Sequence, residues 1–178
     1  MMFETQRLIL RPWAESDAED LYEYASDPRV GPSAGWPVHT SVENSRDIIR
    51  NVLSAPETYA LVLKENGRAV GSVGLKIADA SDLGIPETEA EFGCWIGVPY
   101  WGQGLIPEAI EALTKYAFET LHMEKLWYGY YAENSKSKRV CEKCGFTYAY
   151  TKENVYVSLI DAYKTEHING LTKEDWKK

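Results

Sequence analysis

The stretch Ile96-Gly97-Val98-Pro99-Tyr100-Trp101-Gly102-Gln103-Gly104-Leu105-Ile106 joins the end of a β-strand pattern to the start of an amphipathic helix pattern. Glycine adopts a positive φ easily and lets backbone N–H groups come close to a ligand. The N-terminus of a helix adds unpaired N–H groups and the positive end of the helix dipole. The stretch therefore predicts an anion-binding turn or, on the simpler interpretation, two glycines that only turn the chain.

Two common nucleotide-binding motifs do not fit this turn. The G-x-G spacing of Gly102 and Gly104 lacks the third glycine of a dinucleotide fingerprint and the Lys-Ser/Thr pair of a P-loop. Rossmann-type and P-loop ATPase functions are therefore excluded.

Strand and helix patterns alternate on both sides of the turn, and Asn66-Gly67 between two β-rich runs predicts an antiparallel hairpin. Because no linker or repeat divides the sequence, we expect residues 1–178 to form a single domain of the α+β class, with helices on both faces of a sheet. The expected elements are a strand at 5–12, a helix from Ser16 to about Asp27, a loop at 31–40, a helix from Ser41 to Pro56, strands at 58–64, 69–77 and 89–98, a helix after Gly104, a strand at 125–131, a helix at about 134–143 and a β-rich tail to about Tyr163.

A second feature is a short basic segment, Asn134 to Phe146, which carries four basic residues and one acid in a chain of net charge -8. Asn134 is a suitable N-cap and Gly145 a suitable C-terminal glycine, so the segment is predicted to form a helix. The basic residues are interpreted either as a solvated helix face or as a cationic surface that helps the turn to hold an anion.

The charge of the whole chain limits its partners. With 27 acidic and 19 basic residues, it repels nucleic-acid backbones and favours a basic partner. Apolar runs such as 59–63 are far shorter than the roughly 20 residues that cross a bilayer, so no membrane association is expected. The start, Met1 to Glu4, lacks the pattern of a signal peptide, and the chain has only three cysteines. We therefore expect a cytoplasmic protein.

The spacing Cys141-x-x-Cys144 is compatible with redox chemistry or half of a zinc site. A structural zinc site needs four ligands, and Cys94 and the three histidines lack the spacing to supply the others. We interpret both cysteines as ordinary helix positions and expect no metal.

Taken together, these motifs resemble the GCN5-related N-acetyltransferases, the GNAT family. The resemblance rests on Trp101-Gly102-Gln103-Gly104-Leu105-Ile106, on Asn134-x-x-Ser137 about thirty residues later and on Glu142-Lys143-x-Gly145-Phe146. The opening Thr5 to Pro12, with Asp27-Pro28 and Gly35-Trp36-Pro37, resembles the RimJ/RimL-type branch of ribosomal-protein N-acetyltransferases. The resemblance covers nearly the whole chain. It implies a mixed, mostly antiparallel sheet that splays after its fourth strand, with helices on both faces.

The resemblance also implies that acetyl-CoA is the cosubstrate and lies in the opening of the sheet. The implied contacts are backbone groups of Ile96 and Val98 with the pantetheine amides, the turn Gly102, Gln103, Gly104, Leu105 and Ile106 with the pyrophosphate, Asn134 with the pantetheine arm, and Lys143 with the other basic residues towards the nucleotide.

This chain departs from the family pattern at two positions. Ile106 is larger than the usual residue and is expected to crowd the pyrophosphate. Cys141 stands where many members carry a tyrosine that protonates the leaving thiolate, which excludes a tyrosine acid at that position.

Acetyl transfer needs a neutral amine and a proton for the departing thiolate. Glu91, an acid in the apolar strand before the turn, is a candidate base; a water chain, or a Glu91 that only faces solvent, is the alternative. The resemblance nominates Ser137 to hydrogen-bond the thiolate, with Cys141 as a second candidate and a simple polar role for Ser137 left open.

The sequence therefore predicts an acetyl-CoA-dependent N-acetyltransferase in which a primary amine attacks directly in a ternary complex. The resemblance implies a protein N-terminus as the acceptor. Two alternatives remain: an acetyltransferase for small amines such as polyamines or antibiotics, and a non-catalytic acyl-CoA-binding module. The sequence sets no oligomeric state.

Overall fold

The structure, a computed structural model, describes residues 1–177 and divides the chain into two units, each built from two stretches. Unit 1 contains Met1–Gly74 and Cys94–Ala109, and unit 2 contains Leu75–Gly93 and Ile110–Lys178. Because each unit is discontinuous in sequence, no single cut in the chain separates them. The assignment of 1–178 as one domain stays a prediction.

Eight strands are assigned to one mixed sheet, whose pairs are mostly antiparallel, in the order β1-β2-β3-β4-β5-β6-β8-β7. The strands are β1 (Phe3–Glu4), β2 (Leu8–Arg11), β3 (Thr58–Leu63), β4 (Ala69–Ile77), β5 (Glu89–Ile96), β6 (Lys125–Tyr131), β7 (Thr147–Val157) and β8 (Ala162–Thr172). The α-helices are α1 (Ala18–Ala25), α2 (Gly31–Ala34), α3 (Val42–Ile48), α4 (Leu105–Glu119), α5 (Ser135–Lys143) and α6 (Lys173–Trp176).

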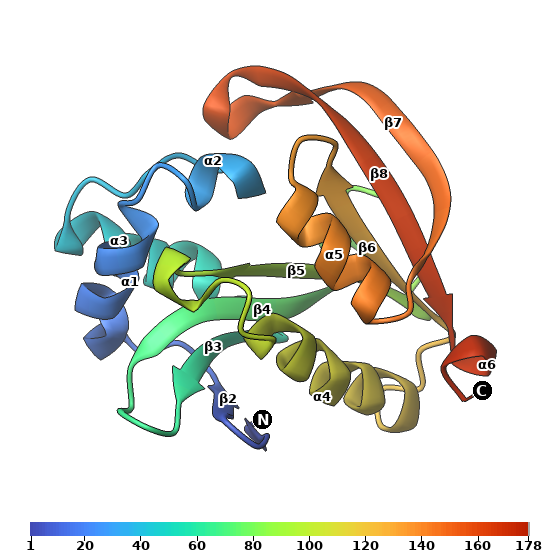
Figure 1. Cartoon of the computed structure of the whole chain (residues 1–178), viewed down its shortest axis with the longest axis horizontal. Coiled ribbons are helices and arrows are strands. Elements are labelled where there is room, and N and C mark those ends of the chain that lie inside the picture. The colour runs from blue at the N-terminus through green and yellow to red at the C-terminus, as the bar shows by residue number, and fades with distance from the viewer. Residues whose placement is uncertain (178) are drawn as a thin grey trace. The chain divides into compact units, whose positions relative to one another are not determined.

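In unit 1, β2 pairs with β3 and β3 with β4, both antiparallel. Leu8 and Leu10 alternate with half-exposed residues along β2, which buries one face of the strand. Gly67 has a φ of 72° in the β3–β4 turn, as expected for a glycine in a tight hairpin. Helices α1 and α3 lie against each other (Figure 1), and their apolar residues join Trp13 in a buried cluster.

In unit 2, β5 and β6 are parallel neighbours, with register from Glu89↔Lys125 to Phe92↔Tyr128. Strand β6 then pairs antiparallel with β8, and β8 with β7, which form a long curved hairpin (Figure 1). Helix α5 lies beside β6, and the ring of Phe146 just after it packs edge-on against Phe92. Among residues 1–177, no helix combines the length and apolarity needed to cross a bilayer.

The predicted mixed, mostly antiparallel sheet with helices is confirmed, but some details of the sequence interpretation are wrong. The expected strand at 89–98 ends at Ile96, and Val98 begins a 3₁₀ turn. The expected loop at 31–40 begins with the short helix α2, because Pro32 in its first turn and Gly35 at its end, with φ of 92°, cap a single helical turn. The β-rich tail does not end near Tyr163: β8 continues to Thr172. The sequence pattern did not indicate the β7–β8 turn, because the residue in the left-handed conformation there is Asp161 and not a glycine.

Candidate active site

The glycine turn follows β5 in unit 1. After Ile96 the chain makes one 3₁₀ turn at Val98–Tyr100, and Gly102 and Gly104 then adopt φ values of 74° and 77°. Those positive φ values are disfavoured for residues with a Cβ, so the two glycines meet a conformational requirement of the turn. Helix α4 begins directly afterwards at Leu105.

The backbone N–H groups from Gly102 to Ile106 donate no hydrogen bond to another of the residues 1–177. Four N–H groups at the start of any α-helix lack helical partners, and the dipole of a 15-residue helix adds positive potential there. The turn therefore presents a set of unsatisfied donors, which is what an oxyanion such as a pyrophosphate needs.

Ile106, the larger residue at the end of the turn, is buried. Its side chain is only 7% exposed, and that of Leu105 is also buried. Whether Ile106 crowds a bound pyrophosphate stays a prediction.

Two side-chain hydrogen bonds help to hold the turn in its conformation. The Arg7 Nη1 atom donates to the Gln103 carbonyl oxygen at 2.8 Å, and the Trp101 indole donates to the Ile96 carbonyl oxygen at 3.0 Å. The expected pairing of Ile96 with pantetheine therefore has to use its N–H group or the second lone pair of that oxygen. It stays a prediction, as does the pairing of Val98.

Glu108, in the first turn of α4, binds residues near the N-terminus of the chain. Its carboxylate accepts hydrogen bonds from Thr5 Oγ1 at 2.6 Å and from the Arg7 N–H and Nε groups, both at 2.7 Å. Burial opposes ionisation, but these hydrogen bonds outweigh it and lower the pKa of Glu108. The carboxylate thus ties Arg7, and through it the turn, to the helix.

Replacing Glu108 with glutamine is expected to lower the free energy of unfolding by about 2 kcal/mol at pH 7, because it weakens these charge-assisted hydrogen bonds. A carboxyl group with a lowered pKa stabilises the fold only while ionised, so the loss should shrink as the pH falls below about 4.5. Chemical denaturation at neutral pH and at about pH 3.5 measures it. Glu111→Gln, at an exposed position of α4, is the control. An equal loss at both pH values contradicts this account.

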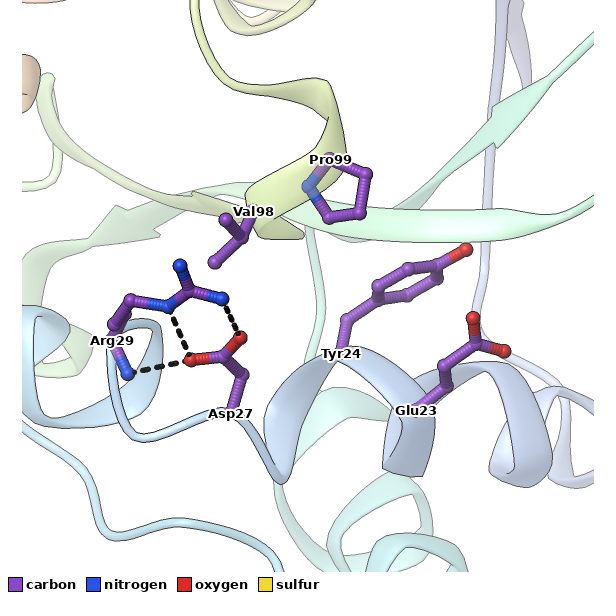
Figure 2. Close-up of a pocket in the computed structure, with 6 residues that line it drawn as sticks. All are labelled: Glu23, Tyr24, Asp27, Arg29, Val98 and Pro99. Atoms are coloured by element: carbon purple, nitrogen blue, oxygen red, sulfur yellow. Dashed lines mark hydrogen bonds and ion pairs between the residues drawn. The ribbon is translucent and has the colours of Figure 1, made fainter.

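A hollow of about 200 Å³ lies beside the start of the turn in unit 1 (Figure 2). Pockets that enclose ligands usually exceed about 300 Å³, so this hollow has room for only part of a large ligand. Within it Arg29 forms a two-pronged ion pair with Asp27, whose pKa it lowers to about 2. The hollow is lined by Glu23, Tyr24, Asp27, Arg29, Val98 and Pro99.

The basic segment forms α5 in unit 2, as predicted. Asn134 caps the helix by accepting a hydrogen bond from the Ser137 N–H group at 3.1 Å, and Gly145 after it has a φ of 83°. The basic side chains of this helix are exposed, and Lys138 lies 3.9 Å from Glu142. The exposed basic residues of α5 are Lys136, Lys138, Arg139 and Lys143.

Ser137 shares a hydrogen bond of 2.8 Å with the hydroxyl of Tyr128, a β6 residue that is 2% exposed. Cys141, one helical turn later, is buried. No tyrosine stands in α5, but a phenol hydroxyl from the adjacent strand reaches the serine. Sequence analysis did not identify Tyr128, because only the packing of α5 on β6 joins the two hydroxyls.

Glu91 is buried in unit 2, at 7% exposure, which excludes the interpretation of it as a charge facing solvent. The Ser81 hydroxyl donates to Glu91 Oε2 at 2.7 Å, and Lys76 Nζ lies 3.9 Å from the same oxygen. These two contacts give the buried carboxylate the polar partners that a buried polar group needs. Its use as a base stays a prediction.

Among residues 1–177, no three His, Cys, Asp or Glu side chains form a group that could hold a metal ion. Within the described part of the chain, Cys94, Cys141 and Cys144 form no disulfide bond. The turn and its supports belong to unit 1, whereas Glu91, Asn134, Ser137 and Lys143 belong to unit 2.

Comparison with known proteins places these features in a family, because residues 7–147 match the domain described as "Acetyltransferase (GNAT) domain". The chain belongs to the GNAT family. GNAT proteins are acetyltransferases that use acetyl-CoA as cosubstrate, and this GNAT protein is accordingly an N-acetyltransferase.

Individual proteins are similar to this chain in sequence or in fold. The chain is 29% identical over 147 residues to "Uncharacterized N-acetyltransferase p20" of Bacillus licheniformis, a match that covers 80% of each chain. The crystal structure of a GNAT-family acetyltransferase from Bacillus anthracis has a TM-score of 0.84 at 23% identity, over 98% of this chain and 99% of that one. The ribosomal-protein-S5-alanine acetyltransferase of Vibrio fischeri has a TM-score of 0.75 at 19% identity, over 100% of both chains.

Proposed function

We propose that this GNAT protein transfers the acetyl group of acetyl-CoA to a primary amine that attacks directly in a ternary complex. The observation that carries this proposal is the row of N–H groups from Gly102 to Ile106, which have no partner within residues 1–177. In the proposal these groups bind the pyrophosphate, and the Ile96 and Val98 backbones pair with pantetheine. Asn134 contacts the pantetheine arm, and Lys143 lies towards the nucleotide.

For the chemistry, we propose that Glu91 takes part in removing a proton from the acceptor amine. Ser137 hydrogen-bonds the departing thiolate and is itself supported by Tyr128, from which it is 2.8 Å away. Hydrogen bonds to a leaving anion are strongest where water is excluded, and Tyr128 is almost fully buried.

A protein N-terminus is the proposed acceptor, and the protein is proposed to act in the cytoplasm. The net charge of -8 favours a basic acceptor such as the tail of a ribosomal protein. One relative in fold is titled a ribosomal-protein-S5-alanine acetyltransferase. An α-amine, with a pKa near 8, also needs less help to lose its proton than a lysine amine does. A polyamine is the second candidate, because the same charge attracts it.

Two measurements together test the proposal and its alternatives. Free-CoA release is measured from acetyl-CoA with peptides bearing free N-terminal alanine or serine, with spermidine and with kanamycin, while calorimetry measures CoA binding. Release with a peptide supports the proposal, and release only with spermidine or kanamycin assigns a small-molecule acceptor. CoA binding without release from any amine identifies a binding module, and an absence of CoA binding overturns the proposal.

The role proposed for α5 predicts a salt effect. Lys143→Ala is expected to weaken CoA binding about threefold at low salt, because an exposed ion pair with phosphate contributes below about 1 kcal/mol. The difference from the wild type should vanish at high salt, where such charges are screened. Lys115→Ala, at an exposed position of α4, is the matched control. If both variants bind CoA like the wild type at low salt, Lys143 has no part in the site.

A further inference from the structure

One face of the sheet in unit 2 carries several carboxylates, of which the sequence indicated only Glu91 as a candidate functional residue. Along β6, Tyr128 points towards Ser137 of α5, so Trp127, Gly129 and Tyr131 point to the opposite face. Glu91 pairs in register with Trp127. A further carboxylate, that of Glu166 in β8, belongs to a residue that pairs with Tyr131. Residues opposite each other in neighbouring strands share a face, so Glu91 and Glu166 lie on the same side of the sheet.

The Glu166 carboxylate lies directly over the backbone of Gly129. A Cβ atom at position 129 would be 2.6 Å from Glu166 Oε1, closer than real Cβ contacts allow. A glycine inside a strand commonly marks a place where another group comes close to the backbone. The parallel register of β5 and β6 runs as far as Phe92↔Tyr128, and the next residue of each strand, Gly93 and Gly129, is a glycine. Glu166 thus lies over Gly129, the residue of β6 that directly follows the segment paired with β5.

The surroundings of Glu166 favour its uncharged form. Burial raises its pKa, and the carboxylates of Glu91 and Asp82 raise it further, against Lys152 and Lys76, which lower it. Among residues 1–177 the Glu166 carboxylate takes part in no hydrogen bond or ion pair, whereas Glu91 is held by Ser81. A half-buried carboxylate without a partner is available to a ligand.

Two tyrosines complete this face. Burial raises the pKa of both Tyr131 and Tyr150, and the negative charge of Glu166 raises each further. Both phenols therefore stay neutral at working pH, and Tyr150 also packs edge-on against Trp127 at 6.2 Å between ring centroids. A carboxylate bordered by aromatic rings is suited to an ammonium group, which both attract.

We propose that Glu166 is a catalytic residue of the acetyl transfer: its carboxylate receives the proton of the acceptor ammonium, and Glu91 acts through it as a positioning residue. This inference rests on the proposed function and assigns the base within it. Ser81 and Lys76 hold Glu91 in place. The negative charge of Glu91 favours the protonated form of Glu166. Two neighbouring carboxylates with different surroundings take different roles in this way.

The proton balance of the step is complete. The ammonium R–NH₃⁺ gives one proton to the Glu166 carboxylate, and the neutral nitrogen attacks the thioester carbonyl carbon. The new C–N bond forms, the C–S bond breaks, and the second proton of the nitrogen passes to the CoA thiolate. The products are the N-acetyl amide and CoA–SH, and Glu166 then releases its proton to solvent.

The test is the pH dependence of kcat/KM with whichever of the peptides or spermidine releases CoA fastest. For the wild type, kcat/KM should fall below the raised pKa of Glu166, because the base is then protonated. Glu166→Gln should lower kcat/KM about 100-fold, a loss within the usual range for a catalytic base, and leave a profile that follows only the pKa of the free amine. Glu166→Asp should keep the acidic limb. Glu91→Gln should move that limb to lower pH, because it removes a neighbouring charge.

Controls separate catalysis from folding. All variants are checked for thermal stability and for CoA binding, which Glu166→Gln should leave within about twofold of the wild type. Glu133→Gln, which removes an exposed carboxylate paired with Lys164, should behave as the wild type. Carbon-13 NMR of labelled glutamate carboxyls gives a reading without turnover: one resonance, absent in Glu166→Gln, should titrate above the ordinary range and shift downwards in Glu91→Gln.

The outcomes are distinguishable. If the wild type releases CoA and Glu166→Gln keeps both its rate and its acidic limb, the inference is wrong and the proposed function stands. If Glu166→Asp is as inactive as the glutamine variant while folded and CoA-bound, Glu166 is not a proton acceptor. If no amine releases CoA from the wild type, the proposed function fails and the inference fails with it.

Discussion

Gly102→Val is expected to weaken CoA binding about 100-fold, the largest loss of affinity that a single change in the turn should produce. Gly102 has a φ of 74°, and a valine held there would be strained by about 1–3 kcal/mol. The chain can relieve that strain only by rotating the neighbouring peptide planes, which turns their N–H groups away from a bound phosphate. The loss corresponds to about 2.7 kcal/mol, the contribution of one or two charge-assisted hydrogen bonds. Calorimetric titration with CoA measures it.

The chain supplies a matched control for this variant. Gly67, in the β3–β4 turn, has a φ of 72°, and a Cβ at either glycine would meet nothing within 4 Å. Gly67→Val and Gly102→Val should therefore lower the melting temperature by similar amounts. Only Gly102→Val should lose CoA affinity. If both variants keep CoA affinity while losing stability, the turn does not bind the pyrophosphate.

Ser137→Ala should lower kcat about 100-fold and change CoA affinity less than threefold, because its hydroxyl is proposed to serve the thiolate only as the C–S bond breaks. Tyr128→Phe removes the hydroxyl 2.8 Å behind it and should lower kcat about tenfold. Cys141→Ala, which tests the other thiolate donor considered for this helix, should leave kcat within about twofold. Stopped-flow or steady-state CoA release measures all three.

Ser135→Ala is the matched control for the serine variant, because Ser135 lies exposed in the first turn of the same helix. It should leave kcat and CoA affinity unchanged. Equal losses of kcat and CoA affinity in Ser137→Ala indicate that the serine shapes the helix and has no part in the chemistry. A large loss in Cys141→Ala together with a small one in Ser137→Ala assigns the proton to the thiol.

Local sequence rules predicted the parts of this protein that depend on neighbouring residues. The two glycines and the start of α4 follow from backbone conformation and helix ends, and the capping of α5 by Asn134 follows from side-chain hydrogen bonding. The hairpin at Gly67 belongs to the same class.

Local sequence rules could not predict the contacts that depend on strand register. Glu166 approaches Gly129 only because β6 and β8 pair with Tyr131 opposite Glu166, across 35 positions of sequence. The Tyr128–Ser137 contact likewise needs α5 to lie on β6. The sequence left open whether Glu91 is buried or faces solvent, and its hydrogen bond comes from Ser81, which lies between the expected strands at 69–77 and 89–98. The periodicity of a sequence predicts on which face of a strand or helix a residue lies, but it does not predict which residue it contacts.

The alternation of the two units along the chain has a consequence for dissecting the protein. The backbone passes between them after Gly74, Gly93 and Ala109, so neither is encoded by one continuous gene segment. Truncation at any of these points leaves an incomplete half with its apolar strands uncovered, and such fragments should aggregate when expressed alone. Reconstitution from separately produced fragments, or a tethered rearrangement of the four segments, is the route to studying either half in isolation.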